Sequence, residues 1–156
     1  GALGHGLPVA VGLAMAAKKS NSTRRIFLIT GDGELAEGSN WEAALAAAHY
    51  GLDNLVIIND KNNLQLAGPT REIMNTDPLA DKWKAFGMTV TECQGNDMSS
   101  VVAAIEGLKQ EGKPNVIIAN TTKGAGISFI QGRPEWHHRV PKGEEIALAL
   151  EELKDE

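Results

Sequence analysis

The sequence has few features of a membrane protein or a secreted one. It contains a single cysteine, Cys93, so no disulfide bond can form within the chain. No apolar run approaches the roughly 20 residues that a membrane-spanning helix needs. We therefore expect a cytoplasmic setting and no membrane partner, with Cys93 as a small packing residue of a strand.

Positive charge is also scarce. Fifteen lysines and arginines are outnumbered by 20 acidic residues, which gives a net charge of −5. The basic residues are scattered, and this argues against a nucleic-acid partner. The length of 156 residues suits a single domain with a hydrophobic core. The chain opens at Gly1 in a loop-like run without a methionine, so we expect one domain over 1–156 that lacks its N-terminal part.

Apolar patterning predicts an alternation of helices and strands. Glycine, proline or a capping box, such as that of Ser39 and Glu42, marks most of the helix ends. The expected helices are 7–19, 43–50, 78–86 (with Asp77 as N-cap), 98–111 (ended by Gly112) and 144–154. The expected strands are 26–29, 55–58, 88–93 and 115–119, the first two apolar enough to be buried on both faces. This order predicts an α/β fold: a mostly parallel sheet with helices on both faces.

Polar and glycine-rich clusters follow three of the predicted strands. They occupy 31–33, 59–63 and 121–126. Ligands of open parallel sheets bind beyond the carboxyl ends of the strands. The sequence therefore predicts a ligand site built from these clusters.

Two of the clusters contain the ligand types that Mg²⁺ and a diphosphate require. Asp32 offers a hard anionic oxygen between two glycines that let the backbone approach a phosphate. Asn62 offers a neutral oxygen 30 residues later, which is room for one loop, one helix and one strand. Each motif alone is usually a turn. Their combination at this spacing favours a metal–diphosphate site.

Further motifs extend from one end of the chain to the other. They are Gly1-Ala2-Leu3-Gly4-His5-Gly6, Gly31-Asp32-Gly33-Glu34-Leu35-Ala36-Glu37-Gly38, Trp41-Glu42-Ala43-Ala44, His49-Tyr50, Leu52-Asp53-Asn54-Leu55, Asn62-Asn63-Leu64-Gln65, Gly68-Pro69-Thr70, Thr122-Lys123-Gly124-Ala125-Gly126 and Glu135-Trp136-His137. Together they resemble the thiamine diphosphate-binding domain of transketolases, most of all the N-terminal subunits of split-type transketolases. The resemblance implies the thiamin diphosphate-binding fold.

The resemblance also implies roles for individual residues. Asp32 and Asn62 match side-chain ligands of Mg²⁺ (or Ca²⁺ or Mn²⁺), and Leu64 matches the position whose backbone carbonyl binds the metal. His137 and Glu37 match residues with catalytic roles, Glu37 at an interface between two active sites. The positions that match the surroundings of thiamine diphosphate are Gly1, Ala2, Leu3, Gly31, Asp32, Gly33, Glu34, Asn62, Lys123 and His137.

Several positions depart from the family pattern or leave a choice open. His5 stands where the family usually has glutamine, and we interpret it as a loop residue near the cofactor. His138 follows His137 where many members have glycine, so either ring could face the pocket. Trp41 and Trp136 are interpreted as packing residues. Glu34 is interpreted as an acid near the metal rather than a ligand.

As for activity, the resemblance implies transfer of a two-carbon ketol unit between sugar phosphates. The glutamate that activates the cofactor lies, in the family, on a pyrimidine-binding domain across a dimer interface. We therefore expect a partner in the form of a pyrimidine-binding C-terminal domain or subunit, in a homodimer or a heterotetramer, and no activity from this chain alone.

Three other functions are alternatives to ketol transfer. A component of a 2-oxo acid dehydrogenase or of deoxyxylulose-phosphate synthase would share Asp32 and Asn62. A nicotinamide-binding domain is disfavoured because Asp32, between the glycines, would repel a pyrophosphate unless a metal intervened. A non-catalytic assembly protein is disfavoured by the joint presence of Asp32, Asn62 and His137.

Overall fold

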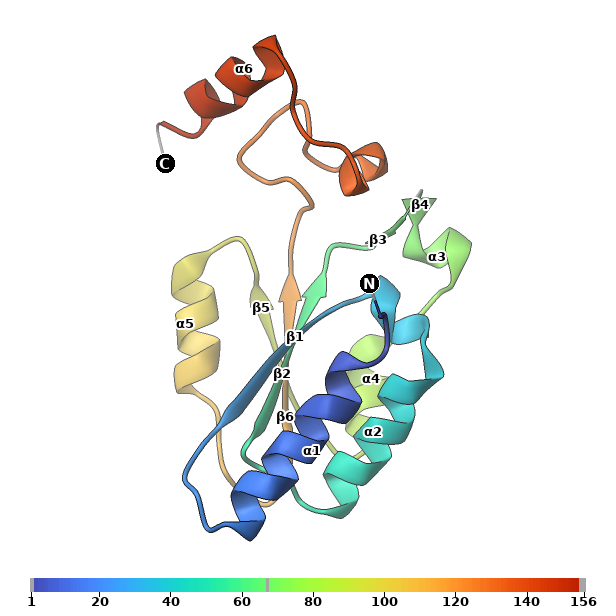
Figure 1. Cartoon of the computed structure of the whole chain (residues 1–156), viewed down its shortest axis with the longest axis vertical. Helices are drawn as coiled ribbons and strands as arrows, with labels where there is room; N and C mark the ends of the chain where they lie inside the picture. Colours follow the sequence, from blue (N-terminus) through green and yellow to red (C-terminus); the bar gives the residue numbers. More distant parts are fainter. Residues whose placement is uncertain (1, 67, 155–156) are drawn as a thin grey trace.

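The computed structural model describes residues 2–66 and 68–154, and its centre is a four-stranded parallel sheet (Figure 1). The sheet order is β1-β2-β6-β5, and every neighbouring pair is parallel. The strands are β1 (Ile26–Gly31), β2 (Leu55–Lys61), β5 (Thr89–Gln94) and β6 (Asn115–Asn120). A small antiparallel hairpin of β3 (Leu64–Gln65) and β4 (Gly68–Pro69) follows β2.

Helices cover both faces of the sheet, as the sequence predicts. Helices α1, α2 and α4 lie on one face and α5 on the other (Figure 1). The helices are α1 (Gly6–Lys19), α2 (Gly38–His49), α3 (Thr70–Ile73), α4 (Leu79–Ala85), α5 (Met98–Glu106) and α6 (Glu144–Glu152), with 3₁₀ turns η1 (Gly33–Ala36) and η2 (Pro134–His137). Within the described part of the chain, no helix is long and apolar enough to cross a membrane.

The main core lies between the sheet and α1, α2 and α4. Alanines such as Ala14 and Ala44 are fully buried, so these helices approach one another and the sheet closely. Trp83 of α4 is fully buried, and its ring centroid lies 4.9 Å from that of Trp41. Trp41 also lies 5.2 Å from Phe86, so its predicted packing role is confirmed.

The second face of the sheet is covered only in part. Cys93 is buried there against Ala104 of α5, and burial raises the pKa of its thiol. By contrast, Phe27 and Ile29 of β1 are 47% and 71% exposed. The prediction that 26–29 is buried on both faces is therefore wrong. The reason is that β1 is an edge strand and α5 packs over the opposite edge of the sheet.

Two predicted helix ends are also wrong, and a third is shifted by one residue. Ser39 lies inside α2, where its hydroxyl donates to the Gly4 carbonyl (2.7 Å), so the predicted capping box does not form. Helix α5 ends before Gly107 rather than at Gly112. Helix α4 begins at Leu79, one residue later than predicted and with Pro78 rather than Asp77 as N-cap.

The position of Trp83 generates a stability prediction. We expect Trp83→Ala to lower the free energy of unfolding by about 3–5 kcal/mol, because it removes the largest side chain of the core and leaves a cavity. Urea denaturation followed by circular dichroism measures the change. Tyr50→Ala is the matched control at a site that is 55% exposed, and we expect a change within about 0.5 kcal/mol. Equal losses in the two variants would contradict this account of the core.

Candidate functional site

The carboxyl ends of β1, β2 and β6 meet at a cavity of about 270 Å³. Strand register places them side by side, since Gly31 pairs with Asp60 and Lys61 pairs with Asn120. The cavity therefore draws on all three clusters that the sequence singles out. Its lining residues are Leu3, Gly31, Asp32, Gly33, Glu34, Asp60, Asn62, Leu64, Gln65, Leu66, Lys123 and His137.

Asp32 is the most deeply buried acid of this cavity, with 2% of its surface exposed. Its Oδ1 accepts from the Gly33 amide (2.8 Å) and its Oδ2 from the Asn63 amide (2.6 Å). Burial raises the pKa of Asp32 above its usual value, the two amides oppose this shift, and nearby Asp60 adds to it. Within the described ranges no lysine or arginine forms an ion pair with Asp32. The carboxylate thus sits where a bound cation would stabilise it.

The loop after β2 brings the other predicted ligands to the same cavity. Asn62 Oδ1 accepts from the Leu64 amide (3.0 Å), and the Asn63 carbonyl accepts from the Thr70 amide (2.9 Å). Asn63 adopts a positive φ of 61°, which reverses the chain between these two bonds. The loop is therefore folded back on itself and on Asp32.

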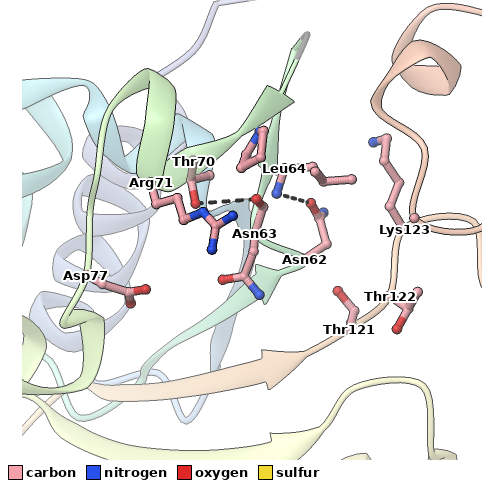
Figure 2. Close-up of a pocket in the computed structure, with 11 residues that line it drawn as sticks. Asn62, Asn63, Leu64, Thr70, Arg71, Asp77, Thr121, Thr122 and Lys123 are labelled. Carbon is pink, nitrogen blue, oxygen red and sulfur yellow. Dashed lines mark hydrogen bonds between the residues drawn. The ribbon is translucent and has the colours of Figure 1, made fainter.

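A second cavity, of about 540 Å³, lies beside the first and shares Asn62, Leu64 and Lys123 with it. Figure 2 shows Lys123 on the segment after β6, across the opening from Asn62. Thr121 joins the segment after β6 to the end of β2, because its amide donates to the Lys61 carbonyl (3.1 Å) and its hydroxyl donates to the Asp60 carboxylate. The position of Lys123 thus depends on bonds between β6 and β2.

Lys123 and His137 form the basic side of the first cavity. The Lys123 Nζ lies 3.4 Å from His137 Nδ1. Desolvation lowers the pKa of His137, and the charges of Lys123 and His138 lower it further. His137 lines the cavity, whereas His138 lies outside the set of described lining residues. Of the two histidines, His137 is thus the one that borders this cavity, and its place in a cofactor site stays a prediction.

Trp136 fixes the segment that contains these histidines. It is buried, its ring lies 5.5 Å from that of Phe129, and the Arg139 guanidinium lies 4.1 Å above it. The predicted packing role of Trp136 is confirmed. His137 and His138 follow it with their rings edge to face at 4.5 Å.

Some of the remaining predicted residues line the cavity and others lie outside it. Glu34 lines the wall, but its Oε1 accepts from the Gly4 amide (3.0 Å), so it holds the loop of Leu3 against the site. Ala2 and Glu37 are exposed and outside the described lining, Glu37 as the N-cap of α2. Gly1 lies outside the described residues.

Sequence reasoning missed three lining residues: Asp60, Gln65 and Leu66. Asp60 belongs to the polar cluster that follows the second strand, and its register opposite Gly31 would have identified it. Gln65 and Leu66 carry no comparable signal. Their place depends on the β3–β4 hairpin, which is too short to show a pattern.

The donors at this site suit a hard cation shared with a ligand rather than a self-contained metal centre. Among the described residues, no group of three or more His, Cys, Asp or Glu side chains is arranged to hold a metal ion. A carboxylate, an amide oxygen and a backbone carbonyl are the oxygen donors that Mg²⁺ accepts, with phosphate oxygens and water completing its shell.

Comparisons with known proteins identify the family of the chain. The family model for the thiamine diphosphate-binding domain of transketolase matches residues 1–154. One of the subunits of an apulose-4-phosphate transketolase from Actinobacillus succinogenes is 74% identical over all 156 residues, which are 56% of that protein. A 6-deoxy-6-sulfo-D-fructose transketolase subunit from a Clostridium species is 41% identical over 157 aligned residues, covering the whole chain and 57% of that protein. The chain therefore spans about half the length of these curated relatives.

Solved structures give the same result. The crystal structure of transketolase from Campylobacter jejuni matches 98% of this chain, and 25% of its own, with a TM-score of 0.92 and 33% identity. The transketolase from Leishmania mexicana matches 98% of this chain and 24% of its own, with a TM-score of 0.85 and 32% identity. Because the domain model matches residues 1–154 and the relatives are named as transketolase subunits, the chain belongs to the transketolase family and contains its thiamine diphosphate-binding domain.

Proposed function

We propose that this chain binds thiamine diphosphate with Mg²⁺ and forms half of a transketolase active site, which transfers a two-carbon ketol unit between sugar phosphates. One observation carries the proposal. Asp32, Asn62 and Lys123, from the ends of three neighbouring parallel strands, line one cavity. The family's cofactor requires such a mixture of oxygen ligands and positive charge.

The proposed metal ligands are the Asp32 carboxylate, the Asn62 side-chain oxygen and the Leu64 carbonyl. The buried Asp32, with its raised pKa and without an ion-pair partner in the described ranges, supports a divalent cation at this position. Ca²⁺ or Mn²⁺ would accept the same oxygens.

Two of the proposed diphosphate contacts, Lys123 and His137, lie on the basic side of the cavity. Lys123 supplies a positive charge, and His137 beside it supplies a ring nitrogen to a phosphate or a substrate hydroxyl. Gly33, which the resemblance assigns to the surroundings of the diphosphate, also lines the cavity, although its amide donates to Asp32 Oδ1 (2.8 Å) in this structure. Leu3 and Leu66, both exposed and lining the cavity, offer apolar contacts to the rest of the cofactor.

The proposed chemistry needs a partner. Thiamine diphosphate supplies a thiazolium carbanion and an electron sink, and this chain's residues hold and orient its diphosphate end. The activating glutamate would come from a pyrimidine-binding domain or subunit. Exposed apolar side chains support such an assembly, as a homodimer or a heterotetramer. They include Val9 and Leu13 of α1 and Phe27 and Ile29 of β1. A cytoplasmic location stays a prediction.

The names of the relatives guide the choice of substrate. The relative at 74% identity is named for apulose 4-phosphate, and one at 41% for 6-deoxy-6-sulfo-D-fructose. We propose a sugar phosphate donor and would test apulose 4-phosphate first. The alternatives, a 2-oxo acid dehydrogenase or a deoxyxylulose-phosphate synthase component, receive less support because the relatives described above are named transketolases.

Cofactor binding is tested directly by isothermal titration with thiamine diphosphate, with and without Mg²⁺. We expect binding that depends on Mg²⁺, and we expect Asp32→Asn to weaken it by more than about 100-fold, because loss of a supporting partner alone costs about 10–100-fold. Asp81→Asn, on the exposed surface of α4, is the matched control and leaves binding unchanged. Equal affinities of wild type and Asp32→Asn would contradict the proposed metal site.

The need for a partner is tested by assaying ketol transfer with and without a pyrimidine-binding transketolase subunit. We expect product from apulose 4-phosphate and an aldose acceptor only when both proteins are present, because this chain supplies only one half of the site. Product formation is followed by nuclear magnetic resonance. Ketol transfer by the chain alone would refute this division of the site, and decarboxylation of a 2-oxo acid would favour the alternative.

The protonation of His137 is tested by titrating its ring with nuclear magnetic resonance over about pH 5–8, a range that spans the ordinary pKa. Because Lys123 disfavours a second positive charge, we expect Lys123→Met to raise the His137 pKa toward its ordinary value. The shift is partial, since desolvation is the larger cause. His137→Gln identifies the resonance, and Lys142→Met serves as the control. A His137 pKa that falls or stays constant in Lys123→Met would show that the two groups do not interact.

A further inference from the structure

Gln65 occupies a position between the two loops that form the proposed metal site. It lies in β3, three residues after Asn62, and its side chain crosses to the turn of Asp32 and Gly33. There its Nε2 donates to the Gly33 carbonyl, at 3.4 Å. It therefore connects the loop that contains one proposed ligand with the turn that contains the other.

The aliphatic part of Gln65 also packs on the turn. A Cβ added at Gly33 would lie 2.9 Å from Gln65 Cγ and 3.1 Å from its Cβ. These distances are too short for an ordinary contact, so the absence of a side chain at Gly33 is what lets Gln65 lie there. Gln65 and Gly33 thus form a fitted pair in the wall of the cavity.

A second side-chain bond between these segments, within the described residues, runs from the Asn63 amide to the Asp32 carboxylate. A cation bound to Asp32 would draw on the same carboxylate. The bond between Gln65 and Gly33 does not involve the Asp32 carboxylate. It would therefore still connect the two segments when Asp32 binds a cation.

The other end of the Gln65 amide is unsatisfied. Its Oε1 is buried and has no hydrogen-bond partner among the described residues, although the side chain lines the cavity. A buried acceptor without a donor is unfavourable. Because Oε1 is closed off from solvent, Gln65 is held in place by its Nε2 bond and by its packing on Gly33 rather than by a bond at Oε1.

We propose that Gln65 is a positioning residue of the metal–diphosphate site, which fixes Gly33 through its Nε2 and through the packing of its aliphatic chain on the turn. The proposal rests on the proposed function of this site. It assigns Gln65 no contact with the reacting atoms. Its effect is exerted on the affinity for metal and cofactor.

The test uses the protein assembled with its pyrimidine-binding partner and compares wild type with Gln65→Met, which keeps the length of the side chain but loses both amide groups. The readouts are the Kd for thiamine diphosphate and the Mg²⁺ concentration for half-saturation, both by calorimetry, and the melting temperature without ligands. We expect both binding constants to rise by about 10-fold or more, as for other groups that support metal ligands, with an unchanged melting temperature. Gln110→Met, at an exposed position, is the matched control.

A double-mutant cycle adds a second readout. Gly33→Ala alone forces a collision with Gln65, so it should weaken cofactor binding more in the wild-type background than beside Gln65→Ala. Wild-type affinity in Gln65→Met would overturn the positioning role. A weaker affinity that is accompanied by a lower melting temperature of the ligand-free protein would also overturn it, because the variant would then have lost stability in general. A wild-type protein that binds no thiamine diphosphate would overturn the proposed function and this inference with it.

Discussion

The site depends on one buried carboxylate that is shared between two loops. Asp32 accepts a backbone amide from its own turn and another from the loop after β2, and so holds the carboxyl ends of β1 and β2 together. The same burial raises its pKa, because the negative charge has lost most of its contact with water. A group that joins the loops is thus also a group that favours a nearby cation. The two carboxylate oxygens of Asp32 thus hold the loops together and would also bind the cation.

The parallel register of the sheet makes this arrangement possible. β1, β2 and β6 run in one direction and end at the same edge, so three loops far apart in the sequence converge there. The acids lie mainly at the ends of β1 and β2, and Lys123 comes from the segment after β6. Acidic and basic groups from the ends of three adjacent strands therefore line one cavity, which suits a ligand that carries phosphates and a metal together. The alanine-rich core allows the helices to pack closely against the sheet whose edge forms the site.

Much of this arrangement could be predicted from the sequence, and the failures have physical causes. The alternation of strands and helices, and clusters such as Gly31 to Gly33, depend on local composition, and the sequence shows them directly. The exposure of Ile29 could not be read in this way, because it depends on which strand forms the edge of the sheet. Ser39 has the pattern of a capping residue but lies inside α2 and bonds to Gly4, a residue 35 positions away. Gln65 was missed for a similar reason, since its role depends on a contact with Gly33 across 32 positions.

The distribution of exposed apolar groups bears on how such a site would operate. Leu3 and Leu66 lie at the cavity with much of their surface open to solvent, and Val9, Leu13, Phe27 and Ile29 are exposed on α1 and β1. Exposed apolar surface of this extent is typical of contact surfaces. Electrostatic interactions between a diphosphate, a cation and Asp32 strengthen when water is excluded. A second protein surface that covered the cavity would therefore complete the site and strengthen cofactor binding. Assembly and cofactor binding would then each favour the other.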